Sequence, residues 1–169
     1  MTTASVVPEV LHPWTIYMRA SEEARRRGDR RTGTDHVLLG LLEDPSIEVV
    51  LGVSLQQARQ ALESLDQEAL GALGLGSGTD APPLPMRAVP KKPTIRAVLK
   101  DRLRMTPAAK KVLEEAVKPN RRKTQVTAQQ VLAQILTLQP PDPAAVLLGA
   151  LGVNTSEVRR RLDAVTPDS

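Results

Sequence analysis

Cysteine and phenylalanine are absent from this sequence, and Trp14 and Tyr17 are its only aromatic residues. The lack of cysteine excludes disulfide bonds, thiolate metal sites and cysteine redox chemistry. With so few aromatic residues, a hydrophobic core has to be built from Leu, Val, Ile and Ala. These side chains suit closely packed helices, whereas the alternating β-branched and aromatic runs typical of strands are scarce.

Long hydrophobic segments are absent too. No run of about 18 apolar residues occurs anywhere in the chain, which argues against a membrane-spanning helix. The N-terminal stretch MTTASVVPEVLHPW lacks the basic region followed by a long apolar segment that marks a signal peptide. Together with the missing cysteine, these features predict a cytoplasmic protein that is neither exported nor inserted in a membrane.

The common catalytic motifs are also missing. The sequence contains no G-x-x-x-x-G-K-[ST] loop for a nucleotide, no H-E-x-x-H zinc motif and no G-x-S-x-G nucleophile elbow. His12 and His36 are the only histidines and lie far apart along the chain, so His36 is interpreted as a structural residue. We therefore predict a protein that is not an enzyme and has no catalytic residue, no metal and no cofactor.

The charge of the chain is basic, with a net charge of +4 and a pI of about 9.8. Nearby acidic residues, such as Glu22 and Asp163, favour solvated helix faces and helix ends as the explanation. A surface that binds nucleic acid is the alternative, although no aromatic residues interleave the charges. The basic residues form three clusters: Arg25, Arg26, Arg27, Arg30 and Arg31; then Arg121, Arg122 and Lys123; then Arg159, Arg160 and Arg161.

Periodic apolar residues predict four helices in the first half of the chain. Pro13 suits the first turn of a helix that ends at Gly28. Thr34 stands where an N-cap is expected, before the apolar run HVLLGLL. The short segment SIEVVL is closed by Gly52, and Ser54 opens a fourth helix with the capping-box pattern.

The second half repeats this plan. Thr106 and Pro107 form an N-cap and first-turn pair, Thr127 caps VLAQIL, and Asn154 caps the last helix. The sequence thus predicts an all-α fold of about eight helices. Three blocks of the two halves match in the same order and without internal gaps: 22–24 over 114–116, 36–42 over 130–136, and 52–63 over 152–163.

Such ordered matches indicate an internal duplication. A quartet of helices of this size buries too little apolar surface to be secure alone, so we expect the two copies to share a core as a pseudo-twofold pair. The expected organisation is an N-terminal tail at 1–12, a first repeat at 13–66 and a second repeat at 105–167. A linker at 67–104, rich in Pro and Gly and then basic, joins them.

These residues resemble a known family, the double Clp repeat (Clp N-terminal) domain of the ClpC/ClpA-type Clp protease ATPases. The resemblance is carried by EEARRRGDRRTGTDHVLLGLLED and LGVSLQQARQAL in the first half, and by MTPAAKKVLEEA, VLAQIL and LGVNTSEVRRRL in the second. It implies a docking module that receives adaptors and substrates, some marked by phosphorylated arginine, and performs no chemistry. With no nucleotide loop, the chain is expected to be a stand-alone domain of this kind without the ATPase module.

The resemblance also implies a set of ligand- or peptide-binding residues: Thr34, Asp35, Thr106 and Gln129. Asp35 matches a family Glu that holds a guanidinium, and a carboxylate suits that planar cation because paired N–H donors meet paired oxygens. Gln129 is the neutral counterpart in the second repeat, where weak binding is expected. The alternative interpretation is that Thr34 and Thr106 are N-caps and Asp35 a first-turn acid.

The expected function is docking of protein or peptide clients, as an adaptor or a decoy for Clp proteolysis. A Clp ATPase ring is an expected partner, a membrane is not, and the protein is expected to be a monomer. Two alternatives stay open: a basic nucleic-acid-binding regulatory protein, and a protein that sequesters a small molecule or peptide antibiotic in a groove between the halves.

Overall fold

The structure is a computed structural model that describes residues 10–74, 104–120 and 125–165. In the first repeat the helices are α1 (Pro13–Arg27), α2 (Thr34–Leu41), α3 (Pro45–Leu51) and α4 (Leu55–Ala72). In the second they are α6 (Pro107–Val117), α7 (Ala128–Ile135), α8 (Pro143–Ala150) and α9 (Thr155–Val165), with a short 3-10 turn (Lys118–Asn120) after α6. The predicted all-α fold of about eight helices in two copies of one motif is confirmed for the described residues.

Local sequence signals set most of the helix ends. Pro13 is the first residue of α1, and Gly28 ends that helix with a left-handed backbone (φ 81°) that glycine adopts without strain. The predicted capping boxes at Ser54 and Thr127 are both present. Asn154 Oδ1 accepts the amide hydrogens of the first turn of α9. These predictions are confirmed.

The expected N-cap at Thr34 is wrong, because α2 is capped by Gly33 and Thr34 is its first residue. The Gly33 amide donates to His36 Nδ1 at 3.0 Å. A side chain at Gly33 would meet the end of the Asp35 side chain, which would have to shift. The start of α2 therefore lies one residue earlier than predicted, and the Thr34 side chain is released for another contact.

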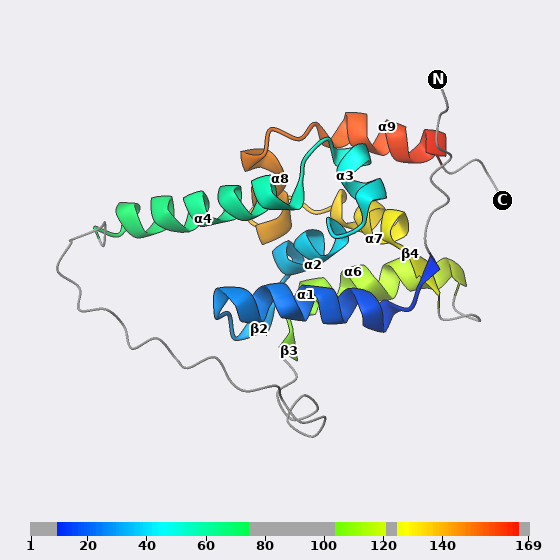
Figure 1. The fold of residues 1–169 in the computed structure, drawn as a ribbon, viewed down its shortest axis with the longest axis horizontal. Coiled ribbons are helices and arrows are strands. Elements are labelled where there is room, and N and C mark those ends of the chain that lie inside the picture. Colours follow the sequence, from blue (N-terminus) through cyan, green and yellow to red (C-terminus); the bar gives the residue numbers. More distant parts are fainter. Residues whose placement is uncertain (1–9, 75–103, 121–124, 166–169) are drawn as a thin grey trace.

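Helix α4 is longer than expected and continues to Ala72, within the range assigned to the linker. Figure 1 shows it extending away from the rest of the molecule. Its residues beyond Leu65 are exposed. Most of the expected linker, the expected tail up to residue 9, and residues 166–167 of the second repeat lie outside the described residues.

Four two-residue strands, which the sequence did not predict, form two separate pairs that link the two halves of the chain. Strand β1 (Val10–Leu11) precedes α1 and pairs antiparallel with β4 (Val126–Thr127), which precedes α7. Strand β2 (Arg31–Thr32) precedes α2 and pairs in parallel with β3 (Arg104–Met105), which precedes α6. Each pair thus joins the segment before a helix of the first repeat to the segment before a helix of the second. Segments of two residues are too short to give a periodic signal.

The core is also shared between the repeats. Helix α2 of the first repeat packs against α7 and α8 of the second, and α3 packs against α7 and α9. Figure 1 shows α2 and α7 in the middle of the molecule, with α1 and α6 on one side and α9 on the other. The largest fully buried side chains are aliphatic and come from both repeats: Ile16, Val37, Leu38, Leu39, Leu41, Leu42, Ile47, Val126, Leu132, Ile135, Leu147 and Leu148.

Candidate functional site

Thr34 lies at the contact between the two repeats and is 1% exposed. Its Oγ1 donates to Asp142 Oδ1 at 2.7 Å and accepts the Ala144 amide hydrogen at 3.3 Å. Asp142 is the N-cap of α8, so Thr34 from the first repeat helps to cap a helix of the second. The Thr34 hydroxyl thus donates one hydrogen bond and accepts another inside the fold, and a ligand role for it stays a prediction.

With the two repeats exchanged, the matching positions are residue 128 at the start of α7 and the N-cap of α3, and this hydroxyl is missing there. Position 128 of α7 matches position 34 of α2, and it is alanine. Asp44 caps α3 by accepting the Ser46 amide hydrogen at 2.9 Å on Oδ1. Its Oδ2 and the Ser46 hydroxyl are buried with no hydrogen-bond partner in the described structure. The Thr34–Asp142 hydrogen bond therefore has no counterpart at Asp44 in the described structure.

Asp35 lies beside an arginine of the same chain. Arg27, at the end of α1, donates from Nη1 to Asp35 Oδ2 at 3.3 Å. The same guanidinium pairs with Asp66 of α4 and lies 3.6 Å from Asp29. Asp35 is only 7% exposed, so its carboxylate faces an internal cation. Sequence reasoning missed Arg27; its signal was the cluster that ends α1, because the turn at Gly28 brings that end back to the start of α2.

The pKa of Asp35 is lowered from its ordinary value. Burial acts in the opposite direction and is the largest single effect, but it is outweighed by hydrogen bonds from His36 and by the charges of His36 and Arg27. The folded protein therefore holds Asp35 as a carboxylate. Its contribution to stability is present above about pH 3.8 and is lost as the pH falls through the lowered pKa.

His36 connects the turn before α2 to two carboxylates. Its Nε2 lies 2.9 Å from Asp29 Oδ2, and its Nδ1 lies 3.2 Å from Asp35 Oδ1. Burial lowers the pKa of His36, but hydrogen bonds and charge from Asp35 and Asp29 outweigh it and raise the pKa above 6.5. When Nδ1 carries a proton it can donate to Asp35, and when it carries a lone pair it can accept the Gly33 amide hydrogen. Nδ1 cannot make both hydrogen bonds at once. These contacts fit the interpretation of His36 as a structural residue, which stays a prediction.

Replacing His36 by Gln should remove a pH dependence of stability. The folded protein holds the His36 proton more tightly than the unfolded chain, so this stabilisation is complete below about pH 6.5 and is lost as the pH rises through the raised pKa. Gln can keep the cap, since Gln130 Oε1 accepts the Thr127 amide hydrogen at the matching place in α7. Urea unfolding between pH 5.5 and 8 should show a flatter profile for His36→Gln, with His12→Gln as control; identical profiles for wild type and His36→Gln would contradict this assignment.

Thr106 caps α6 and also contacts the first repeat. Its Oγ1 accepts the Ala109 amide hydrogen at 3.2 Å, and its own amide donates to the Thr32 carbonyl at 2.9 Å. The structure thus brings Thr106 to the end of β2, and Thr32 precedes Asp35 by three residues. The N-cap prediction for Thr106 is confirmed, and a ligand role for it stays a prediction.

Gln129 lies at the other strand pair. It follows β4 at the start of α7 and is 5% exposed. Strand β4 pairs with β1, where Val10 is exposed. Thr106 and Gln129 therefore lie beside different strand pairs. A ligand role for Gln129 stays a prediction.

A polar pocket of about 460 Å³ lies between the end of α1 and the middle of α4. Glu23 of α1, which is almost fully buried, contacts one of the residues that line the pocket. Its carboxylate is held by Arg59 of α4, with one contact from Nε to Oε2 at 3.2 Å and a second from Nη2 to Oε1. Sequence reasoning also missed this pair. The pocket is lined by Arg26, Arg27, Asp29, Leu39, Arg59, Leu62, Glu63 and Asp66.

Two further observations concern the described residues only. Within those ranges no helix combines the length and the apolar character needed to cross a bilayer. Over the same residues, no three His, Asp or Glu side chains come together in an arrangement that could hold a metal ion.

The fold defines a class of protein: a helical domain of two repeats, in which strands that precede helices of one pair with strands that precede helices of the other and the helices share a core. Over residues 14–137 the sequence matches the family of the Clp repeat (R) N-terminal domain, and the chain belongs to that family.

Comparison with solved structures agrees on the fold. The chain is similar to the crystal structure of the N-terminal domain of the caseinolytic protease associated chaperone ClpD from Arabidopsis thaliana, with a TM-score of 0.57 and 22% sequence identity. The match covers 90% of this chain and 92% of the ClpD domain. At this identity the likeness shows the fold alone. A comparison with curated proteins gave no match.

Proposed function

We propose that this chain is a docking domain that binds protein or peptide clients for a Clp ATPase ring. The observation that carries the proposal is the match to the Clp repeat family over residues 14–137. The described charged residues around Asp35 are paired with one another. We also propose that the domain works in the cytoplasm, as a monomer and without catalytic activity.

Docking can act in two directions. As an adaptor the domain would carry clients to the ring, and as a decoy it would compete with the ring's own N-terminal domain. The test is a reconstituted Clp ATPase and peptidase that degrades fluorescein-labelled casein, with this chain added in increasing amounts. Faster degradation supports the adaptor and slower degradation the decoy. An unchanged rate, together with no recovery of the ATPase or of casein on the immobilised chain, would contradict docking.

The proposal extends to clients marked by phosphoarginine, for which the contact between Asp35 and Arg27 matters. A phosphoarginine side chain that reached this carboxylate would meet Arg27 already in contact with it at 3.3 Å. The two guanidinium groups compete for one carboxylate that is nearly buried. We therefore propose that a phosphoarginine mark binds at Asp35 only when it displaces Arg27.

Removing the internal competitor should strengthen the binding of free phosphoarginine. We expect Arg27→Met to raise the affinity at least about tenfold, because one charged contact on a partly buried carboxylate contributes about 1.4 kcal/mol or more. Calorimetric titration measures the affinity, and amide shifts of residues next to Asp35 locate the ligand. Arg26→Met is the matched control, since Arg26 is more exposed and pairs with Glu23 instead.

Two results would count against this role of Arg27. One is equal affinity of the wild type and Arg27→Met, and the other is an equal gain in Arg26→Met. We expect α2 to stay folded without Arg27, because Asp35 keeps its contact with His36. Thermal unfolding of both variants checks this.

A further inference from the structure

The outer face of the β2–β3 pair carries two arginines side by side. In the register of this pair, Arg31 lies opposite Arg104, and Thr32 lies opposite Met105. Paired residues of neighbouring strands share one face of the sheet. Arg31 and Arg104 are both exposed, whereas Thr32 is buried and Met105 is half-buried against the core. The two arginines therefore face solvent from adjacent positions, one from each repeat.

This arrangement places like charges together. Opposed side chains of the same sign on paired strands repel each other. Arg30, the residue before β2, is exposed as well and adds a third positive charge. Among the described residues, no carboxylate forms an ion pair with Arg30, Arg31 or Arg104. We call Arg30, Arg31 and Arg104 the strand-pair arginines.

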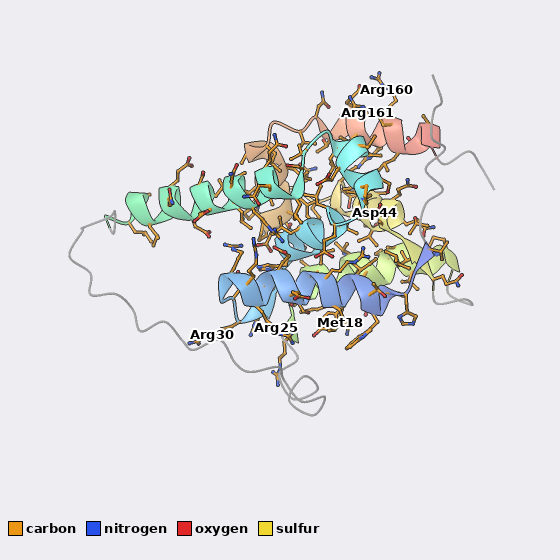
Figure 2. The ribbon with its side chains drawn as sticks, in the orientation of Figure 1. Met18, Arg25, Arg30, Asp44, Arg160 and Arg161 are labelled. Carbon is orange, nitrogen blue, oxygen red and sulfur yellow. The ribbon has the colours of Figure 1, made fainter. Side chains whose placement is uncertain are left out.

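Several other exposed basic side chains differ from this group because an acid lies beside them. Arg160 and Arg161 pair with Glu157 on α9, and Lys110 lies 3.6 Å from Glu114 on α6. Figure 2 shows Arg160 and Arg161 on the opposite side of the molecule from Arg25 and Arg30. Among the described residues, three exposed arginines without a carboxylate partner thus lie together at the strand pair.

We propose that the strand-pair arginines form a docking surface for an acidic segment of a partner protein. Carboxylates between Arg31 and Arg104 offset their mutual repulsion and form paired, charge-assisted hydrogen bonds with the guanidinium groups. The inference rests on the proposed function in one respect, that the partner is a protein.

The chemistry of the surface favours an acidic peptide over a nucleic acid. Surfaces that bind single strands combine a basic track with aromatic side chains on which bases stack. The only aromatic pair of the chain, Trp14 and Tyr17, lies in the first turns of α1, whereas the strand pair follows the far end of that helix. The strand-pair arginines thus offer charge without a stacking platform.

The test compares two double variants of the full chain with the same change in charge. Arg31→Gln with Arg104→Gln removes the opposed pair, and Lys110→Gln with Arg160→Gln removes two exposed charges elsewhere. The probes are a fluorescein-labelled oligoglutamate peptide and a labelled single-stranded oligothymidine, followed by fluorescence anisotropy. We expect wild type to bind the oligoglutamate peptide, the strand-pair variant to bind it about tenfold more weakly, and the control to stay within about twofold of wild type.

Binding of oligoglutamate should also weaken as salt is raised, because the contacts are exposed. The proposal is overturned by an equal loss in both double variants, by the absence of oligoglutamate binding, or by tighter binding of oligothymidine that depends on Arg31 and Arg104. The casein degradation assay separates this inference from the proposed function. If both double variants change degradation as wild type does while oligoglutamate binding is absent, docking stands and the acidic-segment surface fails.

Discussion

Replacing Arg59 by Leu is expected to lower the free energy of unfolding by about 3 kcal/mol, because it leaves a buried carboxylate without its main partner. Glu23 is 2% exposed and is held by Arg59 through two contacts. The second arginine near it, Arg26, lies 3.6 Å away and is half exposed, so it compensates only in part. Denaturation by urea, with the midpoint and the slope both determined, measures the loss.

The matched controls separate the ion pair from the packing of α1 against α4. Arg26→Leu should cost less than about 1 kcal/mol, since exposed pairs contribute little. Replacing Glu23 and Arg59 together by Leu should recover much of the stability that Arg59→Leu loses, because no charge is then left buried. If Arg59→Leu were no more harmful than Arg26→Leu, Glu23 would not depend on Arg59.

The second large loss of stability is expected at the Thr34–Asp142 hydrogen bond between the repeats. Replacing Thr34 by Val keeps the shape of the side chain but removes the hydroxyl that donates to Asp142 at 2.7 Å. A hydrogen bond to a charged group contributes about 1.5–3 kcal/mol, so we expect a loss of about 2 kcal/mol. Thr34→Ser retains the hydroxyl and should lose less. Urea unfolding of the three proteins measures both effects.

A gain in stability is expected where the matching hydroxyl is missing, at position 128 of α7. Ala128→Thr introduces a hydroxyl at the position that matches Thr34, and the matching acid is Asp44, whose Oδ2 is buried without a partner in the described structure. We expect a gain of about 1 kcal/mol from the new hydrogen bond. Ala128→Val is the control for added volume, and it should not stabilise. A destabilised Ala128→Thr alongside a neutral Thr34→Val would show that the contacts between the repeats do not depend on these hydroxyls.

The parts of the fold that follow local rules could be predicted from the sequence. Pro13 and Gly28 bound α1, and the Ser54 capping box opens α4, because caps and first-turn prolines depend on residues only a few positions apart. The pairing of β2 with β3 could not be predicted in this way. It joins segments from different repeats through two residues each, and such contacts depend on how the repeats dock.

The candidate site shows the same division. The residues at the start of α2 were identified by matching a family pattern, which gives position but not surroundings. Thr34 turned out to bind across the repeats to Asp142, and Asp35 to face Arg27. Both partners come from other elements of the fold. The identity of a side chain therefore predicted what chemistry it could perform, while the tertiary contacts determine whether that capacity is already used.

The central claim is that the two repeats form one unit, because strands, helices and the Thr34–Asp142 hydrogen bond cross between them. Differential scanning calorimetry of the intact chain tests this most directly. We predict a single unfolding transition in which the calorimetric and van't Hoff enthalpies agree, as expected when all elements unfold together. Two separate transitions, or a calorimetric enthalpy well above the van't Hoff value, would contradict it.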